Sequence, residues 1–246
     1  MSPDAEVVVR PPGRATYGID APNILIGLSA ASILALLVGF FMAAGRGPVL
    51  GIGPWLLALV LAIGAAWVAW GTLRTKPRLW RRTLDRLALD GDERALDLGC
   101  GRGLVLIETA KRLPEGHADG VDIWRNRDQS GNRRISTELN ARIEGVTERV
   151  TIHDADITRL PFADDTFDLV TASFSLRSLA VADERTEAVE QTARVLRPGG
   201  RVVILDDAHT AELADHLSRL GFTDVTRSAP MVGFGPPARL LTATAP

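Results

Sequence analysis

A glycine-rich segment at residues 95–103, Ala-Leu-Asp-Leu-Gly-Cys-Gly-Arg-Gly, carries the most specific chemistry in the chain. An apolar strand is expected to lead into Asp97 and then into alternating glycines at Gly99, Gly101 and Gly103. Glycine allows a sharp turn and lets a ligand approach main-chain atoms that a Cβ would block. The segment therefore predicts a site for a nucleoside-bearing cofactor, with a carboxylate at the end of the strand.

The position after these glycines argues against a dinucleotide. A dinucleotide fingerprint needs a third glycine at position 104, where the diphosphate rests on the start of a helix, but the chain has Leu104 there. The pattern favours a cofactor without a diphosphate. A glycine-rich turn in some other α/β protein stays open as an alternative on this segment alone.

Further motifs follow in order along the chain. Residues 117–123 are expected to form a second strand that ends in Asp122, where a carboxylate can accept hydrogen bonds from both ribose hydroxyls. Residues 149–157 predict a third strand and loop, and residues 160–170 lead into a fourth strand. Residues 195–205 predict a Pro-Gly-Gly turn and a fully apolar fifth strand.

This series of motifs resembles that of the class I S-adenosyl-L-methionine (AdoMet) methyltransferases over about residues 90–246. It is closest to the methyltransferase type 11 branch that includes the ubiquinone and menaquinone C-methyltransferases, on Leu160-Pro-Phe and on residues 173–178. The latter segment departs from the quinone enzymes at Ser175 and Ser178, and residues 122–132 resemble instead a group of membrane-attached methyltransferases. The resemblance implies AdoMet as the cofactor and leaves the acceptor open.

The resemblance also implies a fold and a set of binding residues. The fold is a Rossmann-like α/β sheet of seven strands, of which the last is antiparallel. Ile123 would pack on the adenine, Asp156 would accept from its amino group, and the Ile157 amide would donate to the ring. The cofactor-binding residues implied are Asp97, Gly99, Gly101, Gly103, Asp122, Ile123, Asp156, Ile157 and Ser173.

Two long apolar segments precede this domain. No charged residue lies between Asp20 and Arg46 or between Arg46 and Arg74, so each gap holds about twenty-five uncharged residues. Each is long enough to cross a hydrocarbon core of about 30 Å, and apolar side chains cover every face. We expect a transmembrane helical hairpin. A buried hairpin of a soluble protein, or a signal peptide cleaved at Ala43-Ala44, are the alternatives.

Small residues recur at every fourth position in both segments. They are Gly27, Ala31, Ala35 and Gly39 in the first and Ala58, Ala62 and Ala66 in the second. Rows of small residues let two helix backbones approach closely in lipid. They predict packing of the hairpin on itself, with dimerisation as the alternative.

Basic residues flank the two apolar segments unevenly. Arg74, Lys76, Arg78, Arg81, Arg82 and Arg86 follow the second segment, Arg10 and Arg14 precede the first, and Arg46 lies in the turn. Because Lys and Arg are enriched on the cytoplasmic side, we expect a multi-pass protein of the cell membrane with its N-terminus and catalytic domain in the cytoplasm.

The expected organisation has four parts. They are a disordered tail at residues 1–20, the hairpin at 21–73, a basic juxtamembrane linker helix at 74–90 and the AdoMet-binding domain at 91–246. The net charge of −2 and the interspersed charges give no footprint for nucleic acid. Cys100 is the single cysteine, and no His/Cys cluster has metal-ligand spacing, so no metal is expected. The oligomeric state is left open.

Candidate catalytic groups lie where strands four and five should end. His209 has a side chain suited to act as a general base, and Asp206 could orient it or the substrate. The alternative for His209 is a surface histidine at a helix start. The sequence thus predicts methyl transfer to a small, lipophilic acceptor at the membrane. A non-catalytic AdoMet-binding or membrane scaffold module is the alternative.

Overall fold

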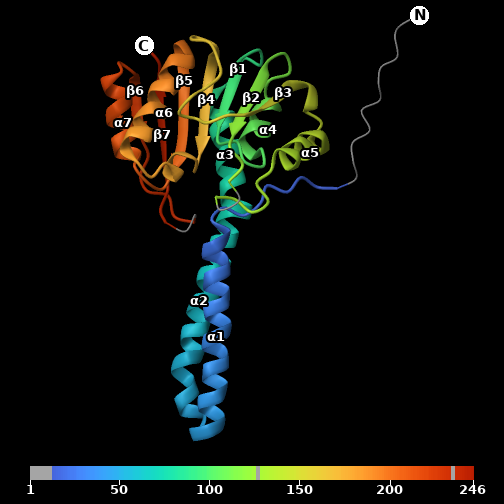
Figure 1. The fold of residues 1–246 in the computed structure, drawn as a ribbon, viewed down its shortest axis with the longest axis vertical. Helices are drawn as coiled ribbons and strands as arrows, with labels where there is room; N and C mark the ends of the chain where they lie inside the picture. The colour runs from blue at the N-terminus through green and yellow to red at the C-terminus, as the bar shows by residue number, and fades with distance from the viewer. Residues whose placement is uncertain (1–12, 126–127, 234–235) are drawn as a thin grey trace, which may run out of the picture.

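A computed structural model describes residues 13–125, 128–233 and 236–246, and it divides into an α/β domain and a long helical hairpin (Figure 1). The strands are β1 (Arg94–Leu98), β2 (His117–Asp122), β3 (Val150–Asp154), β4 (Phe167–Ser173), β5 (Leu196–Asp206), β6 (Thr223–Arg227) and β7 (Arg239–Thr244). They form one seven-stranded sheet in the order β3-β2-β1-β4-β5-β7-β6. β7 pairs antiparallel with both β5 and β6, and the pairs among β1 to β5 are parallel. The predicted sheet is therefore confirmed.

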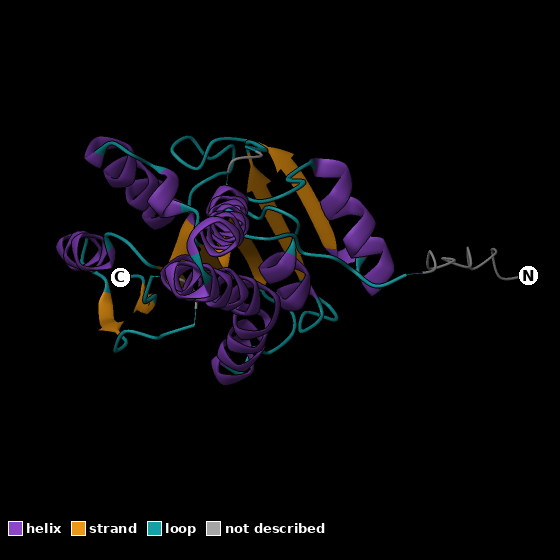
Figure 2. Ribbon diagram, turned by 90° about the horizontal axis from the view of Figure 1, so that it is seen from below, coloured by secondary structure: helices purple, strands orange, loops and turns teal. Residues whose placement is uncertain are grey.

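Helices cover both faces of this sheet (Figure 2). They are α3 (Lys76–Leu87), α4 (Leu104–Ala110), α5 (Arg134–Glu144), α6 (Ala182–Val195) and α7 (Thr210–Arg219). Side chains alternate between the faces along each strand, so Leu96 packs in the cluster that includes α6 and α7, whereas Ala95 packs in the cluster that includes α3 and α4. The sheet thus has a separate apolar core on each side, and its strand ends are left for ligands.

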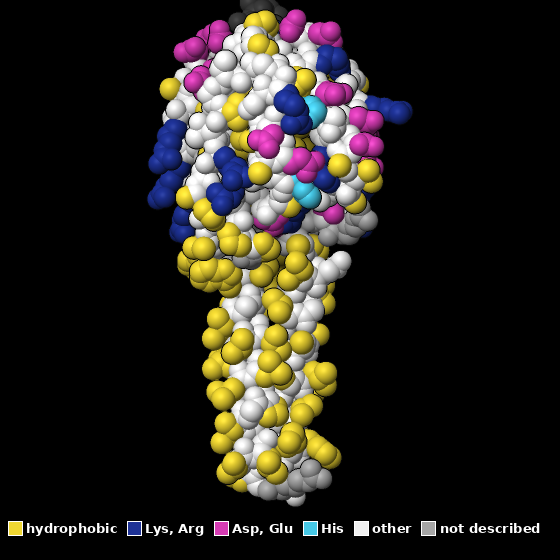
Figure 3. Space-filling view, turned by 90° about the vertical axis from the view of Figure 1, so that its left-hand side faces the viewer, with side chains coloured by type: hydrophobic (Ala, Val, Ile, Leu, Met, Phe, Trp, Pro, Cys, Tyr) yellow, Lys and Arg dark blue, Asp and Glu magenta, His cyan; other side chains and the backbone are white. Residues whose placement is uncertain are grey.

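The hairpin consists of α1 (Pro22–Arg46) and α2 (Ile52–Trp70), joined by a short 3₁₀ helix at Pro48–Gly51. Both helices are long and apolar enough to cross a membrane, by length and composition. Their large apolar side chains point outward, and Phe41 is 83% exposed. Figure 3 shows this apolar surface around the hairpin, with the charged side chains gathered on the domain.

Small residues form the contact between α1 and α2, but not all of those predicted. Ala35 and Ala58 are buried, as the predicted rows require, and Ser32 Oγ donates to the Ala58 carbonyl at 2.8 Å. Ala62 and Ala66 are exposed. Gly27 and Ala31 are exposed as well, so the predicted row on the first helix is correct only at Ala35 and Gly39. The row on the second helix is correct only at Ala58, because its contact face repeats every seven residues and continues at Ala65.

The predicted linker helix belongs to the domain. A π-helical turn at Gly71–Thr75 connects α2 directly to α3. Trp80 and Leu84 on α3 are 0% and 1% exposed and pack in the same cluster as Leu106 of α4. The domain core therefore begins at α3, and the apolar hairpin continues into it without an intervening linker.

The predicted disordered tail also differs in its described part. Residues 13–20 lie along the domain, where the Thr16 amide donates to Asn140 Oδ1 at 3.1 Å and the Ile19 amide donates to Ser130 Oγ at 2.8 Å. These polar partners come from α5 and from the loop before it. Composition alone could not indicate them, because they lie more than a hundred positions away in the chain.

Candidate active site at the carboxyl edge of the sheet

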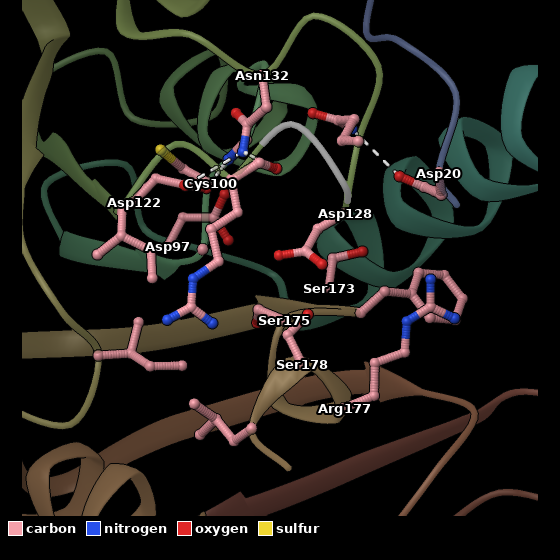
Figure 4. A pocket seen from close by; sticks show the side chains of 18 of the residues that line it. Asp20, Asp97, Cys100, Asp122, Asp128, Asn132, Ser173, Ser175, Arg177 and Ser178 are labelled. Carbon is pink, nitrogen blue, oxygen red and sulfur yellow. Dashed lines mark hydrogen bonds between the residues drawn. The ribbon is translucent and has the colours of Figure 1, made fainter. Parts of the chain in front are cut away.

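One pocket lies at the carboxyl ends of β1, β2 and β4, where open α/β sheets bind ligands. Its wall contains Asp97 and the glycine turn on one side and Asp20 and Lys76 on the other (Figure 4). The carboxyl edge of the sheet faces the hairpin (Figure 1). The pocket is therefore close to the point where the chain enters and leaves the two apolar helices.

The glycine turn requires glycine for two physical reasons. Gly99 and Gly101 have φ angles of 66° and 53°, in the left-handed region that side chains disfavour. A Cβ on Gly101 would lie 2.5 Å from Gln129 Oε1, and one on Gly99 would overlap Ser175. The turn thus brings the main chain to the pocket wall, with Gln129 and Ser175 packed directly against it.

Asp97 ends β1 beneath this turn and is 3% exposed. Its carboxylate accepts from Thr171 Oγ1 at 2.8 Å and from the Leu106 amide at 3.1 Å. Burial raises the pKa of Asp97 to about 7, against the opposing effect of these hydrogen bonds. A cation bound beside Asp97 would favour the ionised form.

Asp122 ends β2 and joins the glycine turn to the next loop. It accepts from the Gly101 amide at 2.8 Å, from the Trp124 amide at 2.6 Å and from Asn132 Nδ2 at 3.2 Å. Burial raises the pKa of Asp122, and the same hydrogen bonds oppose the rise. Because a carboxylate has about four lone-pair positions, it retains capacity to accept from a ligand.

The residues predicted to hold the adenine lie together on the same pocket. Ile123 is 43% exposed and offers an apolar face, and Ile157 and Asp156 come from the loop after β3. Asp156 is fixed by Thr158, whose amide and hydroxyl both donate to it at 2.9 Å. Ser173 also lines the pocket and accepts from Trp80 Nε1 at 2.9 Å.

Three predicted residues are not brought to the pocket wall. Gly103 precedes α4 and does not lie among the described residues that line the pocket. His209 precedes α7, where its ring lies 3.3 Å from Glu212, and Asp206 is fully buried. Neither His209 nor Asp206 lies among the lining residues. The structure therefore does not bring this predicted pair to the pocket wall, and their catalytic role stays a prediction.

Asp206 has a structural contact instead. It accepts from the amides of Arg177 at 3.1 Å and of Asp207 at 2.8 Å, and burial raises its pKa. The 3₁₀ helix at Leu176–Ser178 thus lies between the end of β5 and the pocket. Arg177 and Ser178 of this helix line the pocket, whereas the predicted pair does not.

The side of the pocket that faces the hairpin consists of residues outside the predicted set. Lys76 Nζ donates to Asp20 Oδ2 at 2.9 Å, and the ring of Phe174 has Lys76 Nζ at 5.3 Å and Arg177 Cζ at 4.8 Å from its centroid. A second, smaller cavity is lined by Asp20, Thr72, Phe174 and Arg177. It shares three of these residues with the main pocket and extends toward the π-helical turn.

Polar groups that line the pocket suit the predicted cofactor. The Ser175 hydroxyl and Asn132 Oδ1 are buried, line the pocket and have no hydrogen-bond partner among the described residues. Such orphaned atoms are expected where a polar ligand completes the site. With the close-approach glycines, the carboxylates and exposed Ile123, they suit a cationic nucleoside.

Comparison with known proteins agrees with this assignment. Residues 95–200 match the sequence model of a protein family that is described as a methyltransferase domain. A demethylmenaquinone methyltransferase from Halalkalibacterium halodurans is 33% identical over 131 residues, which are 52% of this chain and 49% of that protein. The chain spans about half the length of the curated relatives it matches.

Solved structures show the same fold at low sequence identity. A SAM-dependent methyltransferase from Aquifex aeolicus has a TM-score of 0.54 and 17% identity, over 68% of this chain and 89% of that chain. The [4+2]-cyclase SpnF has a TM-score of 0.55 and 21% identity, over 69% and 80%. Residues 95–200 of the α/β domain therefore match a methyltransferase domain, and the domain has the fold of these solved structures.

Proposed function

We propose that the chain is a membrane-attached methyltransferase that transfers a methyl group from AdoMet to a lipophilic acceptor of the quinone type, at the cytoplasmic face of the membrane. One observation carries the proposal. Asp20, which precedes the first apolar helix, and Lys76, which follows the second, line the same pocket as Asp97 and Asp122. A lipophilic acceptor from the bilayer and AdoMet from the cytosol can therefore meet in this pocket.

The cofactor end of the pocket has a residue for each part of AdoMet. Asp122 would accept from the ribose hydroxyls, Ile123 would cover one face of the adenine, and Asp156 and the Ile157 amide would read its edge. Asp97 and Asp122 place negative charge next to a cationic cofactor, in a site where burial strengthens the attraction. AdoMet supplies an electrophilic methyl group whose departure from sulfur needs no proton.

The remaining task of the protein is to hold the acceptor in line with the methyl group. The pocket leaves the region near Phe174, Ser175 and Arg177 for it. Arg177 can donate to a carbonyl or hydroxyl oxygen of the acceptor, and this part of the pocket is the one nearest to the hairpin. The quinone assignment draws on the name of the H. halodurans relative.

The cytoplasmic orientation draws on the basic residues beside the apolar helices. Arg78, Arg81 and Arg82 lie on α3, directly after the second helix. A run of this kind favours the anionic cytoplasmic leaflet. Reporter fusions after Arg14 and Pro246 should both report a cytoplasmic location, and a fusion near Gly47 should report the opposite side.

Lipid profiling of a deletion strain tests the acceptor. Membrane lipids from the deletion strain should contain a species that lacks one methyl group and that disappears when the full-length gene is restored. Restoration with Asp122→Ala should leave the species in place. A lipid extract that is the same with and without the gene would contradict the proposed function.

A further inference from the structure

The segment just before α1 pairs with the loop just before α5. We name residues 16–21 the N-terminal strap and residues 128–132 the docking loop. The Ser130 amide donates to the Ile19 carbonyl at 3.0 Å, and the Ala21 amide donates to the Asp128 carbonyl at 3.1 Å. Ile19 in turn donates to Ser130 Oγ. The strap is thus held by main-chain contacts immediately before the first apolar helix begins.

A chain of side-chain hydrogen bonds then connects the strap to the glycine turn. Gln129 Nε2 donates to Asp20 Oδ1 at 3.2 Å, and Gln129 Oε1 accepts from the Arg102 amide at 2.8 Å. Asp20 Oδ2 accepts from Lys76 at the same time. Asp20, just before the first apolar helix, therefore contacts both Lys76, which continues the second helix, and Gln129, which supports the cofactor turn (Figure 4).

A second set of contacts places the strap directly against Arg102. The Arg102 guanidinium donates to Thr16 Oγ1 at 2.7 Å, and Asn140 Nδ2 donates to the carbonyls of both Thr16 and Arg102 at 3.0 and 2.8 Å. A Cβ on Gly18 would lie 2.7 Å from the Ser130 carbonyl oxygen, so the fit leaves no space. Gln129 and Asn140 thus each bind the main chain of Arg102 in the glycine turn and also contact the strap.

We infer that Asp20 and Gln129 are positioning residues for AdoMet: Gln129 holds the glycine turn at the Arg102 amide, and Asp20 holds Gln129 from the strap. The pair thus couples cofactor affinity to the seating of the membrane hairpin. The inference rests on the proposed function only in taking AdoMet as the ligand of this turn. It gives a role to the docking loop, which belongs to the segment 122–132 that resembles membrane-attached methyltransferases and departs from the quinone methyltransferases. Because coupling is reciprocal, bound AdoMet must also hold the strap more firmly.

A reciprocal exchange of the two polar groups tests this in the full-length protein in detergent. In Gln129→Glu, a carboxylate faces the Asp20 carboxylate, although an oxygen is still present for the Arg102 amide. In Asp20→Asn, either the Gln129 amide or the Lys76 ammonium loses its acceptor. In the double variant, the amide introduced at position 20 would donate to the carboxylate introduced at position 129 and accept from Lys76, so that every contact is restored at the same net charge.

We expect each single variant to weaken AdoMet binding at least fivefold by calorimetry, and the double variant to return within twofold of the wild type. Tyr17→Phe is the control. Tyr17 belongs to the strap but does not line the pocket, and the substitution removes only its hydroxyl contact to Glu144 of α5. Single variants that bind like the wild type would overturn the inference. So would a double variant no better than the weaker single one, because Asp20 would then act by touching the cofactor itself.

Hydrogen exchange supplies the second readout. The amides of Ile19 and Ala21 should exchange more slowly with AdoMet bound in the wild type, and this slowing should be lost in Gln129→Glu. If the exchange rates of these amides in the wild type are the same with and without AdoMet, the inference is also overturned. If the wild type binds no AdoMet, the proposed function fails; if it binds AdoMet and the variants match it, only the coupling fails.

Discussion

The two ends of the pocket are built in different ways. Much of the cofactor end lies within residues 97–132, where Asp122 joins the glycine turn to Asn132, and Asp156, Ile157 and Thr171 add to it from later in the chain. The end that faces the hairpin is assembled from distant positions, such as Lys76 and Asp20, which lie 56 residues apart. The structure of the cofactor end can therefore recur in many methyltransferases. The structure of the other end depends on the apolar helices of this chain.

The comparison also separates what each end can do. Backbone amides and carboxylates of the cofactor end match a cationic nucleoside. At the other end, Lys76 and Arg177 lie over Phe174 beside a cavity that leads toward Thr72. We expect substitutions at the first end to change AdoMet affinity, and those at the second end to change use of the acceptor or the attachment of the hairpin.

The largest effect is expected from Trp80→Ala, which breaks the junction between the hairpin and the domain. Trp80 is fully buried, and its loss should lower the free energy of unfolding of the domain by about 3–5 kcal/mol. Chemical denaturation in detergent measures it, with Arg82→Ala on the exposed face of α3 as the control. A loss under about 1 kcal/mol would mean that α3 is a linker after all.

Next comes Asp122→Ala, which tests the cofactor end. The variant removes the acceptor of the Gly101 and Trp124 amides as well as the proposed ribose contact, and should weaken AdoMet binding by about 2–3 kcal/mol, or roughly 30–150-fold. Calorimetry measures the affinity. Asp164→Ala, on an exposed ion pair with Arg194, is the matched control. An affinity within threefold of the wild type would remove Asp122 from the site.

Thr72→Trp tests the end that faces the hairpin by filling the second cavity. Turnover of a demethylmenaquinol in vesicles should fall about tenfold, or about 1.4 kcal/mol, while AdoMet affinity stays unchanged. Leu73→Trp is the control, because Leu73 is 54% exposed on the same π-helical turn and does not line the cavity. Equal turnover in the two variants would place the acceptor elsewhere.

The smallest effect is a pH dependence. Since the pKa of Asp97 is about 7, against its ordinary value of 3.8, the folded protein without ligand retains a proton that the unfolded chain has released. Asp97 therefore lowers stability as the pH rises toward and through 7. A cationic cofactor needs the ionised form, so AdoMet affinity should rise several-fold from pH 6 to pH 8. Calorimetry across this range should show no such rise in Asp97→Asn; a pH-independent wild type would contradict the assignment.

Sequence reasoning succeeded where one short segment determines both conformation and chemistry. The glycine turn and the strand that ends in Asp122 follow from local patterns, the seven-stranded sheet follows from the family resemblance, and the apolar helices follow from the absence of charge. It did not place Asp206 and His209, because a strand end predicts position along the sheet but not the contacts of each side chain: the 3₁₀ helix binds Asp206, and His209 lies beside Glu212. The sequence showed only that Asp20 and Lys76 flank the apolar segments. It could not predict that they pair, because their pairing depends on how the hairpin folds back.

The central claim is that a bilayer ligand and AdoMet meet in this pocket. Full-length protein in vesicles that contain a demethylmenaquinol with an isoprenoid chain, supplied with AdoMet labelled in its methyl group, tests it most directly. We predict that the label moves into the lipid extract, and that it fails to do so with Asp122→Ala. A wild-type protein that binds AdoMet yet labels neither this quinol nor any lipid of its native membrane would contradict the account.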